Sequence, residues 1–456
     1  MKASVKKLGL GDLVLDRQGS FTLRILLFIF GVALKLFFRR IETFNAGVVP
    51  LDKPVIFVHN HPNGLIDPAL VFVALPRKIS FLAKSTLFKM PVISFLLRTV
   101  EALPLYRQID AGADVSKNQK TFAVCRELLK KGGAIALFPE GVSHSSPKVL
   151  PAKTGAARIA LGTVSVGEPI DLHIVPVGLF YTSKTTFRSE ALLHFGEPFR
   201  VEAIELDEDG QPPKAPVKAL TKRIEEAIRD VTVNAETDAD LNTARIAERI
   251  FAATYQNEDL AEKLEFLKNY IADQEREGHL EENIELKEKL VAYEKRLDEL
   301  GLDAEHLSLS QVSKGFVIKR ALAQVWSLIV LSPLAILGTV LHYIPYRLCN
   351  VAARLFARHD VDDIVSTVKL LAGIVFLPLT WTLIGGVLGY FFGWQIGLAS
   401  VPVAMLSAYV ALYSIEEMEE LRGWARAIWL FLRRRETFLR LFVERRELLE
   451  DLREFD

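Results

Sequence analysis

Two long runs without charged side chains constrain the fold of this chain most strongly. Residues 321–346 and residues 370–415 contain no Asp, Glu, Lys or Arg. A membrane-spanning helix needs about 20 consecutive apolar residues, so the first run is long enough for one span and the second for two. The core of a soluble protein rarely contains charge-free runs of this length. The sequence therefore predicts an integral membrane protein with two to three spans in residues 316–415.

The flanking charges do not select one orientation for these spans. Lysines and arginines precede, separate and follow the two runs, so the rule of positive cytoplasmic loops fits several topologies. Pro333 lies within the first run, and the alternative for this run is a re-entrant hairpin. We expect the soluble part of the chain on the cytoplasmic side. Residues 416–456 are predicted to form a basic amphipathic tail helix on the membrane surface.

Residues 1–44 contain a shorter apolar stretch at residues 21–38, which includes Arg24 and Lys35. Its uncharged part is short for a membrane span, and no small-residue cleavage site of a signal peptide follows it. We expect an amphipathic helix that lies in the membrane interface. A helix buried in a protein core is the alternative.

Charge and cysteine content argue against several classes of protein. The formal net charge is zero, so no overall field attracts nucleic acid. Cys125 and Cys349 are the only cysteines and lie far apart in the chain. This argues against a disulfide scaffold and against a metal site built on cysteine, and it favours a reducing compartment.

Residues 45–202 alternate short apolar runs with helical patterns, which is typical of an α/β domain. A helix is expected at residues 120–132, and strands are expected at residues 54–59, 78–83, 133–139, 172–180 and 191–196. Residues 203–315 have helical periodicity with dense charge. They predict a charged helical arm that is exposed or paired with itself, and a homodimer through this arm is conceivable.

The stretch FVHNHPNGLIDPALV at residues 57–71 places two histidines and an aspartate just after a strand. An H-x-H pair at a strand end occurs in metal-dependent hydrolases, which need further ligands. His173 and His194 are available, but neither precedes another ligand type at a suggestive spacing. The metal site therefore remains a remote alternative.

General acid–base chemistry is the second interpretation of this stretch. A neutral imidazole can accept a proton from a hydroxyl when a carboxylate holds its ring in the right tautomer. Asp67 follows His61 by six positions, about 600° of rotation on a continuous helix, so the two side chains would point apart. The turn at residues 62–64, Pro-Asn-Gly, lets them meet. We expect His61 at the strand end and Asp67 in the first turn of the next helix.

Four motifs in order resemble the glycerolipid acyltransferase superfamily. Asn60-His61 with Asp67-Pro68 resembles the first motif, and the five residues between His and Asp resemble the fungal-type glycerol-3-phosphate/dihydroxyacetone-phosphate acyltransferases and their bacterial relatives. The later motifs are ALPLYR ending at Arg107, the block LFPEGVSHS, and the apolar strand IVPVGL around Pro176. The resemblance covers about residues 45–200 and implies a mixed sheet flanked by helices.

The resemblance also implies roles for individual residues. His61 would be the general base and Asp67 would orient it, while Arg107 would bind the phosphate of the acceptor. The remaining expected substrate contacts are Phe138, Pro139, Glu140 and Gly141 at the glycerol moiety, Pro176 in the wall of the site, and Lys84 and Lys153 as further phosphate contacts. Glu140 is expected to contact a hydroxyl or to position an arginine, because a carboxylate repels phosphate.

The implied reaction moves a fatty acyl group from an acyl thioester to a hydroxyl of glycerol 3-phosphate or dihydroxyacetone phosphate in phospholipid synthesis. The acyl-CoA or acyl-ACP would be a co-substrate, with no resident cofactor and no metal. The main alternative is a lysophosphatidate 2-acyltransferase, and a membrane scaffold without enzymatic activity is a further one. The expected partners are membrane lipids and these substrates, not nucleic acid.

Overall fold

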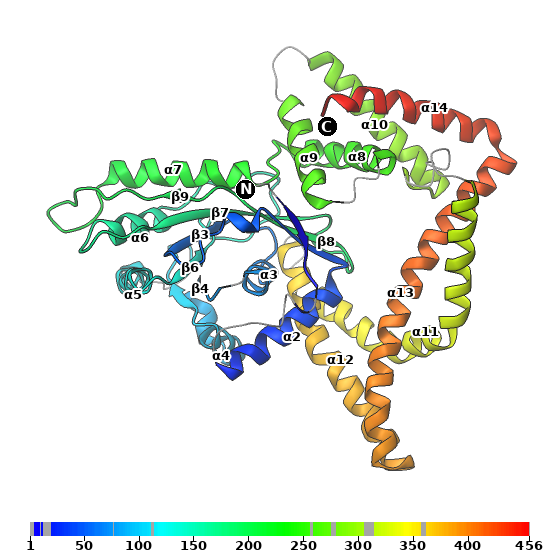
Figure 1. The fold of residues 1–456 in the computed structure, drawn as a ribbon, viewed down its shortest axis with the longest axis horizontal. Coiled ribbons are helices and arrows are strands. Elements are labelled where there is room, and N and C mark those ends of the chain that lie inside the picture. Colours follow the sequence, from blue (N-terminus) through cyan, green and yellow to red (C-terminus); the bar gives the residue numbers. More distant parts are fainter. Residues whose placement is uncertain are drawn as a thin grey trace. The chain divides into compact units, whose positions relative to one another are not determined.

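The computed structural model describes residues 4–9, 11, 20–75, 77–110, 114–255, 259–274, 280–304, 314–356 and 362–455 (Figure 1). The chain divides into two compact units. Unit 1 comprises Met1–Asn234 and Phe356–Leu370, and unit 2 comprises Ala235–Leu355 and Leu371–Asp456.

A mixed sheet forms the centre of unit 1. Within the described residues its order is β1-β2-β8-β7-β3-β6-β4-β5, with β9 paired to β7. Neighbours are parallel except for β1 with β2 and for β7 with β8 and β9. The strands are β1 Val5–Lys7, β2 Arg40–Phe44, β3 Val55–His59, β4 Ser80–Lys84, β5 Leu103–Leu105, β6 Ala134–Leu137, β7 His173–Tyr181, β8 Glu190–Phe195 and β9 Phe199–Arg200.

Helices cover both faces of this sheet (Figure 1). Ile56 and Val58 of β3 point into a core that α5, α6 and α7 close on one face. On the other face, Phe72 of α3 lies against Phe81 of β4, with ring centroids 6.2 Å apart. The helices of this unit are α2 Phe21–Phe37, α3 Ile66–Ala74, α4 Pro91–Thr99, α5 Asn118–Lys130, α6 Gly155–Val164 and α7 Lys214–Asp230. The predicted mixed α/β architecture is confirmed, and all five expected strands are present.

The amino-terminal segment, residues 1–44, was predicted to be separate from the α/β domain but belongs to unit 1. Strand β2 pairs with β8 inside the sheet. Helix α2 buries Leu23, Leu27 and Leu34, as a core helix does. Its opposite side exposes Phe21 and Phe28, which leaves an apolar face for a membrane interface.

The predicted charged arm begins later than residue 203. Helix α7 packs against β7, where a Cβ on Gly178 would lie 1.8 Å from the carbonyl oxygen of Val231. Only glycine tolerates so close an approach of backbone. Unit 1 therefore extends to Asn234, because the apolar stripe of α7 at Val217, Ile224 and Ile228 completes its core.

The described residues of the predicted arm beyond Asn234 lie in unit 2 and form mainly helices. Helices α8, α9 and α10 contact one another or α14, and the tail helix α14 buries Phe438, Leu441 and Leu448 there. The expected position of the tail helix on the membrane surface stays a prediction, and its buried apolar stripe packs on these helices. The bounds are α8 Asp238–Tyr255, α9 Leu260–Gln274, α10 Leu280–Leu300 and α14 Arg435–Leu452.

Three helices in the described part of the chain are long and apolar enough to cross a membrane, at Gln324–Phe356, Val365–Phe392 and Trp394–Arg433. They belong to α11 Lys314–Phe356, α12 Asp362–Phe392 and α13 Trp394–Arg433. Helix α11 continues through Pro333 and Pro345, so the re-entrant alternative is not formed. Helix α13 continues to Arg433, so the tail helix starts only at Arg435.

Glycines shape the contact between α12 and α13. A Cβ on Gly397 would lie 2.5 Å from the carbonyl oxygen of Gly385 and 2.7 Å from the Cα of Gly389. Small residues of this kind let membrane helices approach closely. Gly393 takes a positive φ of 97° in the turn between the helices. Gly386 has open space around its Cα and takes no part in this packing.

Candidate functional site

The turn after β3 brings His61 and Asp67 together. Gly64 has a positive φ of 44°, and Asp67 lies in the first turn of α3. The His61 Nδ1 atom is 2.8 Å from Asp67 Oδ2. Separation by a turn rather than by a continuous helix explains how residues six positions apart can touch.

Asp67 is fully buried and accepts hydrogen bonds from three parts of the fold. The backbone N–H of Asn63 donates to Oδ2 at 2.7 Å, and the Tyr181 hydroxyl donates to Oδ1 at 2.6 Å. Burial and the neighbouring Asp67 raise the pKa of Tyr181 well above its usual value, so its hydroxyl keeps its proton and donates. The amide and the hydroxyl are both donors to the Asp67 carboxylate, and a His61 tautomer with its proton on Nδ1 donates to it in the same way. This leaves Nε2 as the ring nitrogen able to accept a proton.

The His61 ring is held face-on against Phe138. The ring centroids are 3.9 Å apart and the planes differ by 14°. The His61 side chain is 18% exposed, and Nε2 makes no hydrogen bond within the described residues. Phe138 was expected to contact substrate; the contact observed is with the imidazole, which it fixes in orientation.

His59 is a different kind of histidine. Its side chain is fully buried and neither ring nitrogen has a hydrogen-bond partner. Burial, with a smaller effect from His61, lowers its pKa to about 3, so it is neutral at physiological pH. Among the residues the structure describes, no three His, Cys, Asp or Glu side chains gather as metal ligands. The two histidines of the H-x-H pair thus differ in burial and hydrogen bonding, although both rings lie against Phe138.

Arg107 lies in a cluster with Lys84 and Asp110. Its Nε and Nη2 atoms donate to the two carboxylate oxygens of Asp110 at 3.0 and 2.8 Å. Lys84 Nζ is 3.1 Å from Asp110 Oδ1. Hydrogen bonding to Arg107 is the main reason that the pKa of Asp110 is lowered. Two cations thus share one carboxylate, and sequence reasoning missed Asp110 although it follows Arg107 by three positions.

The FPEG block joins this cluster to the His61 turn. Gly141 has a positive φ of 78°, and its carbonyl oxygen accepts a hydrogen bond of 2.6 Å from Arg107 Nη1. The backbone N–H of His144 donates to the carbonyl oxygen of His61 at 3.1 Å. Glu140 is buried and pairs through Oε2 with His144, while its Oε1 has no hydrogen-bond partner.

The other expected site residues have structural contacts. The carbonyl oxygen of Pro139 accepts from the backbone N–H of Lys153 at 2.7 Å. Pro176 is buried in β7 opposite Val58 of β3, and its carbonyl oxygen accepts from Gly196. Lys153 is exposed. No contact shown by the structure assigns these residues to a substrate, so their expected roles stay predictions.

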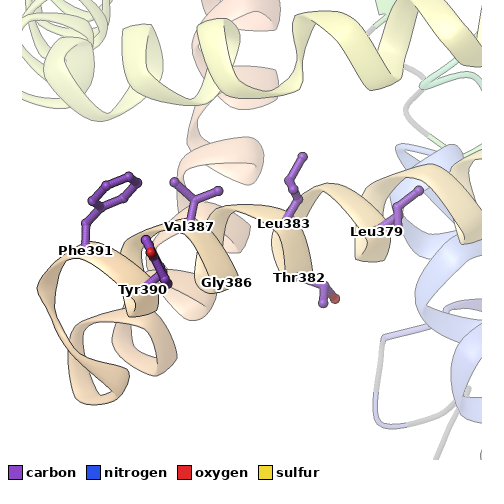
Figure 2. A pocket seen from close by; sticks show the side chains of 7 residues that line it. All are labelled: Leu379, Thr382, Leu383, Gly386, Val387, Tyr390 and Phe391. Carbon is purple, nitrogen blue, oxygen red and sulfur yellow. The ribbon is translucent and has the colours of Figure 1, made fainter.

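The part of α12 that belongs to unit 2 carries an apolar groove, lined by Leu379, Thr382, Leu383, Gly386, Val387, Tyr390 and Phe391 (Figure 2). None of these lining residues is a histidine, a carboxylate or a basic residue. The groove therefore offers apolar surface but no group for acid–base chemistry.

Neutral burial of His59 predicts a pH-dependent stability. The unfolded chain binds a proton at His59 below about pH 6.5, whereas the folded chain does not, so the wild type loses stability as pH falls from about 7 to about 5. The His59→Phe variant has no proton to bind at this position. Between about pH 7 and about pH 5 we expect the free energy of unfolding of the wild type to fall by about 2 kcal/mol more than that of the variant. Pulse proteolysis in urea measures the free energy of unfolding of both proteins, and an equal fall in the two would contradict the neutral burial of His59.

The comparisons with known proteins point to one family. Residues 39–179 match the family model described as Acyltransferase. Glycerol-3-phosphate O-acyltransferase 2 of Saccharomyces cerevisiae is 27% identical over 281 residues, which are 59% of this chain and 38% of that protein. A chloroplastic 1-acyl-sn-glycerol-3-phosphate acyltransferase of Brassica napus is 31% identical over 147 residues, which are 32% of this chain and 39% of that protein.

A solved 1-acyl-sn-glycerophosphate acyltransferase from Thermotoga maritima is 21% identical, with a TM-score of 0.33, and the match covers 47% of this chain and 82% of that one. The matches to the yeast and the Brassica napus proteins cover about two fifths of the length of each of those proteins. The expected resemblance to fungal glycerol-3-phosphate acyltransferases is confirmed, while the meaning of the five-residue spacing stays a prediction. Residues 39–179, the part of the chain that matches the Acyltransferase family model, contain the His61 turn, the Arg107 cluster and the FPEG block.

Proposed function

We propose that this protein transfers a fatty acyl group from an acyl thioester to a hydroxyl of glycerol 3-phosphate. The observation that carries the proposal is the His61–Asp67 pair, with Nδ1 bonded to the carboxylate and Nε2 unbonded. Nε2 takes the proton of the acceptor hydroxyl as its oxygen attacks the thioester carbonyl. The C–S bond then breaks, and the leaving thiolate receives the proton from His61. Asp67 stabilises the imidazolium between these two transfers.

Direct attack by the acceptor fits the chain better than a covalent acyl-enzyme. Burial raises the pKa of Cys125 to about 12, so its thiol is a poor nucleophile. The sequence contains no G-x-S-x-G elbow. The acceptor oxygen is therefore the proposed nucleophile.

The acceptor phosphate is proposed to bind at the cluster of Arg107 and Lys84. Two cations face one carboxylate there, so one positive charge remains for an anion. The planar guanidinium suits a phosphate, and it retains its charge at every relevant pH. Glu140 is proposed to accept a hydrogen bond from a glycerol hydroxyl, because its buried Oε1 lacks a partner.

Glycerol 3-phosphate is the proposed acceptor because the yeast relatives named for it match 56 to 59% of this chain. Relatives named for 1-acylglycerol 3-phosphate match about a third of it or less. Lysophosphatidate is therefore the second candidate acceptor, and dihydroxyacetone phosphate is the third. Acyl-CoA or acyl-ACP is the proposed donor.

The membrane setting agrees with a lipid product. The apolar face of α2 at Phe21 and Phe28 is proposed to lie in the interface, with unit 1 on the cytoplasmic side. The arm helices α8 and α10 pack against α14 of their own chain. A homodimer through the helical arm stays a prediction.

An acyl-transfer assay in membranes tests the proposal. Glycerol 3-phosphate, dihydroxyacetone phosphate and lysophosphatidate are offered separately with one labelled acyl-CoA. We expect the wild type to acylate glycerol 3-phosphate and His61→Ala or Asp67→Asn to lose about 10²–10⁴-fold in kcat, the usual value of general-base catalysis. His173→Ala is the matched control, because His173 lies at the amino end of β7. Full activity of His61→Ala would refute the mechanism.

Tyr181→Phe tests the third hydrogen bond to Asp67. Loss of the hydroxyl leaves Oδ1 with one donor fewer, so we expect kcat to fall about three- to tenfold while KM for the acceptor stays within about twofold. Tyr293→Phe is the control, since Tyr293 is also buried and its hydroxyl has no hydrogen-bond partner. An unchanged kcat in Tyr181→Phe would remove Tyr181 from the catalytic assembly.

A further inference from the structure

Helix α3, which carries Asp67, has no side-chain cap from its N-cap residue, and the Ile66 N–H at its start donates to the carbonyl oxygen of Asn63 at 3.0 Å. The first N–H groups of a helix have no partner within the helix and need one from elsewhere. The residue before α3 is Leu65, whose side chain cannot accept a hydrogen bond. The Leu65 N–H donates instead to the Thr367 hydroxyl, at 3.0 Å. A residue about 300 positions later in the chain therefore satisfies the start of the catalytic helix.

Two neighbours of Thr367 contact the loop between β7 and β8. Ser366 is fully buried, and its hydroxyl donates to the carbonyl oxygen of Lys184. The side-chain amide of Asn63 donates to the same oxygen at 3.3 Å. Lys369 Nζ donates to the carbonyl oxygen of Thr185 at 3.0 Å. One helical turn of α12 thus contacts both the turn after His61 and the loop beyond Tyr181.

These contacts lead directly to the catalytic pair. Asn63 donates its backbone N–H to the same Asp67 oxygen that His61 contacts. Asn63 thus contacts both the Asp67 carboxylate and the carbonyl oxygen of Lys184. Leu65 contacts both the α3 backbone and the Thr367 hydroxyl. Removal of the α12 contacts would leave the Leu65 N–H without its partner and free the turn to move.

We propose that Thr367 and Ser366 are positioning residues that hold the His61–Asp67 turn in its reactive geometry. This proposal rests on the proposed acyl transfer. Both residues belong to α12, within the stretch Val365–Phe392 that is long and apolar enough to cross a membrane. The same helix therefore contains a stretch that can cross a membrane and the residues that hydrogen-bond to the His61–Asp67 turn and its neighbouring loop. The catalytic site would be complete only when this part of α12 is in place.

The test replaces the oxygen of Thr367 at nearly constant shape. Thr367→Val removes the acceptor of the Leu65 N–H, and Thr367→Ser keeps it. In full-length protein we expect the valine variant to lose about three- to tenfold in kcat, with KM for both substrates within about twofold, and the serine variant to recover most of the loss. Thr382→Val is the matched control on the same helix, because the exposed Thr382 hydroxyl donates only to the Pro378 carbonyl of its own helix.

Hydrogen exchange gives a readout that does not depend on activity. In detergent-solubilised wild type and variants, peptides covering residues 61–70 are compared by mass spectrometry. We expect exchange there to rise at least about threefold in Thr367→Val and to return toward wild type in Thr367→Ser. Unchanged exchange in Thr367→Val would overturn the proposal, and so would faster exchange with an unaltered kcat. A wild type inactive on every acceptor would refute the proposed function, while the exchange comparison still tests the Thr367 contact.

Discussion

The buried carboxylate of Asp67 is the constraint on which the α/β domain of unit 1 depends. A charge removed from water is costly unless several donors surround it. The three donors to Asp67 come from the strand-end histidine, from the turn at Asn63 and from Tyr181 at the end of β7. Two neighbouring strands and the α3 helix must therefore be in register before this carboxylate can be buried. Once it is, His61 is held by one nitrogen and presents the other.

The sheet topology explains why distant motifs meet at this point. β3, β6 and β7 are parallel neighbours, so their carboxyl ends lie at one edge of the sheet. His61 follows β3, the FPEG block follows β6, and Tyr181 ends β7. Within that block, Phe138 stacks on His61 and Gly141 accepts from Arg107. The proposed base and the proposed phosphate site are joined by four consecutive residues.

Sequence reasoning predicted what local patterns encode. Apolar runs marked five strands, and the Pro-Asn-Gly turn correctly placed His61 next to Asp67. The charge-free runs indicated membrane helices. Partners from distant segments were missed: Tyr181 and Thr367 have no local pattern that links them to the site. Asp110 was missed although it follows Arg107 by three positions. Unit 1 extends past the predicted start of the arm because α7 buries an apolar stripe that sequence alone could also assign to a membrane interface or to a partner. The membrane-surface placement of the tail helix stays a prediction, although α14 also buries an apolar stripe.

The most direct test of the account is the tautomer of His61. Nitrogen NMR of protein labelled at histidine, with His61→Ala used for assignment, distinguishes protonated from unprotonated ring nitrogens at about pH 8, where an unperturbed imidazole is neutral. The account predicts the proton on Nδ1 and an unprotonated Nε2 in the wild type, with this preference weakened in Asp67→Asn. A wild-type His61 that carries its proton on Nε2 could not accept one from a hydroxyl there, and this result would contradict the proposed role of the pair.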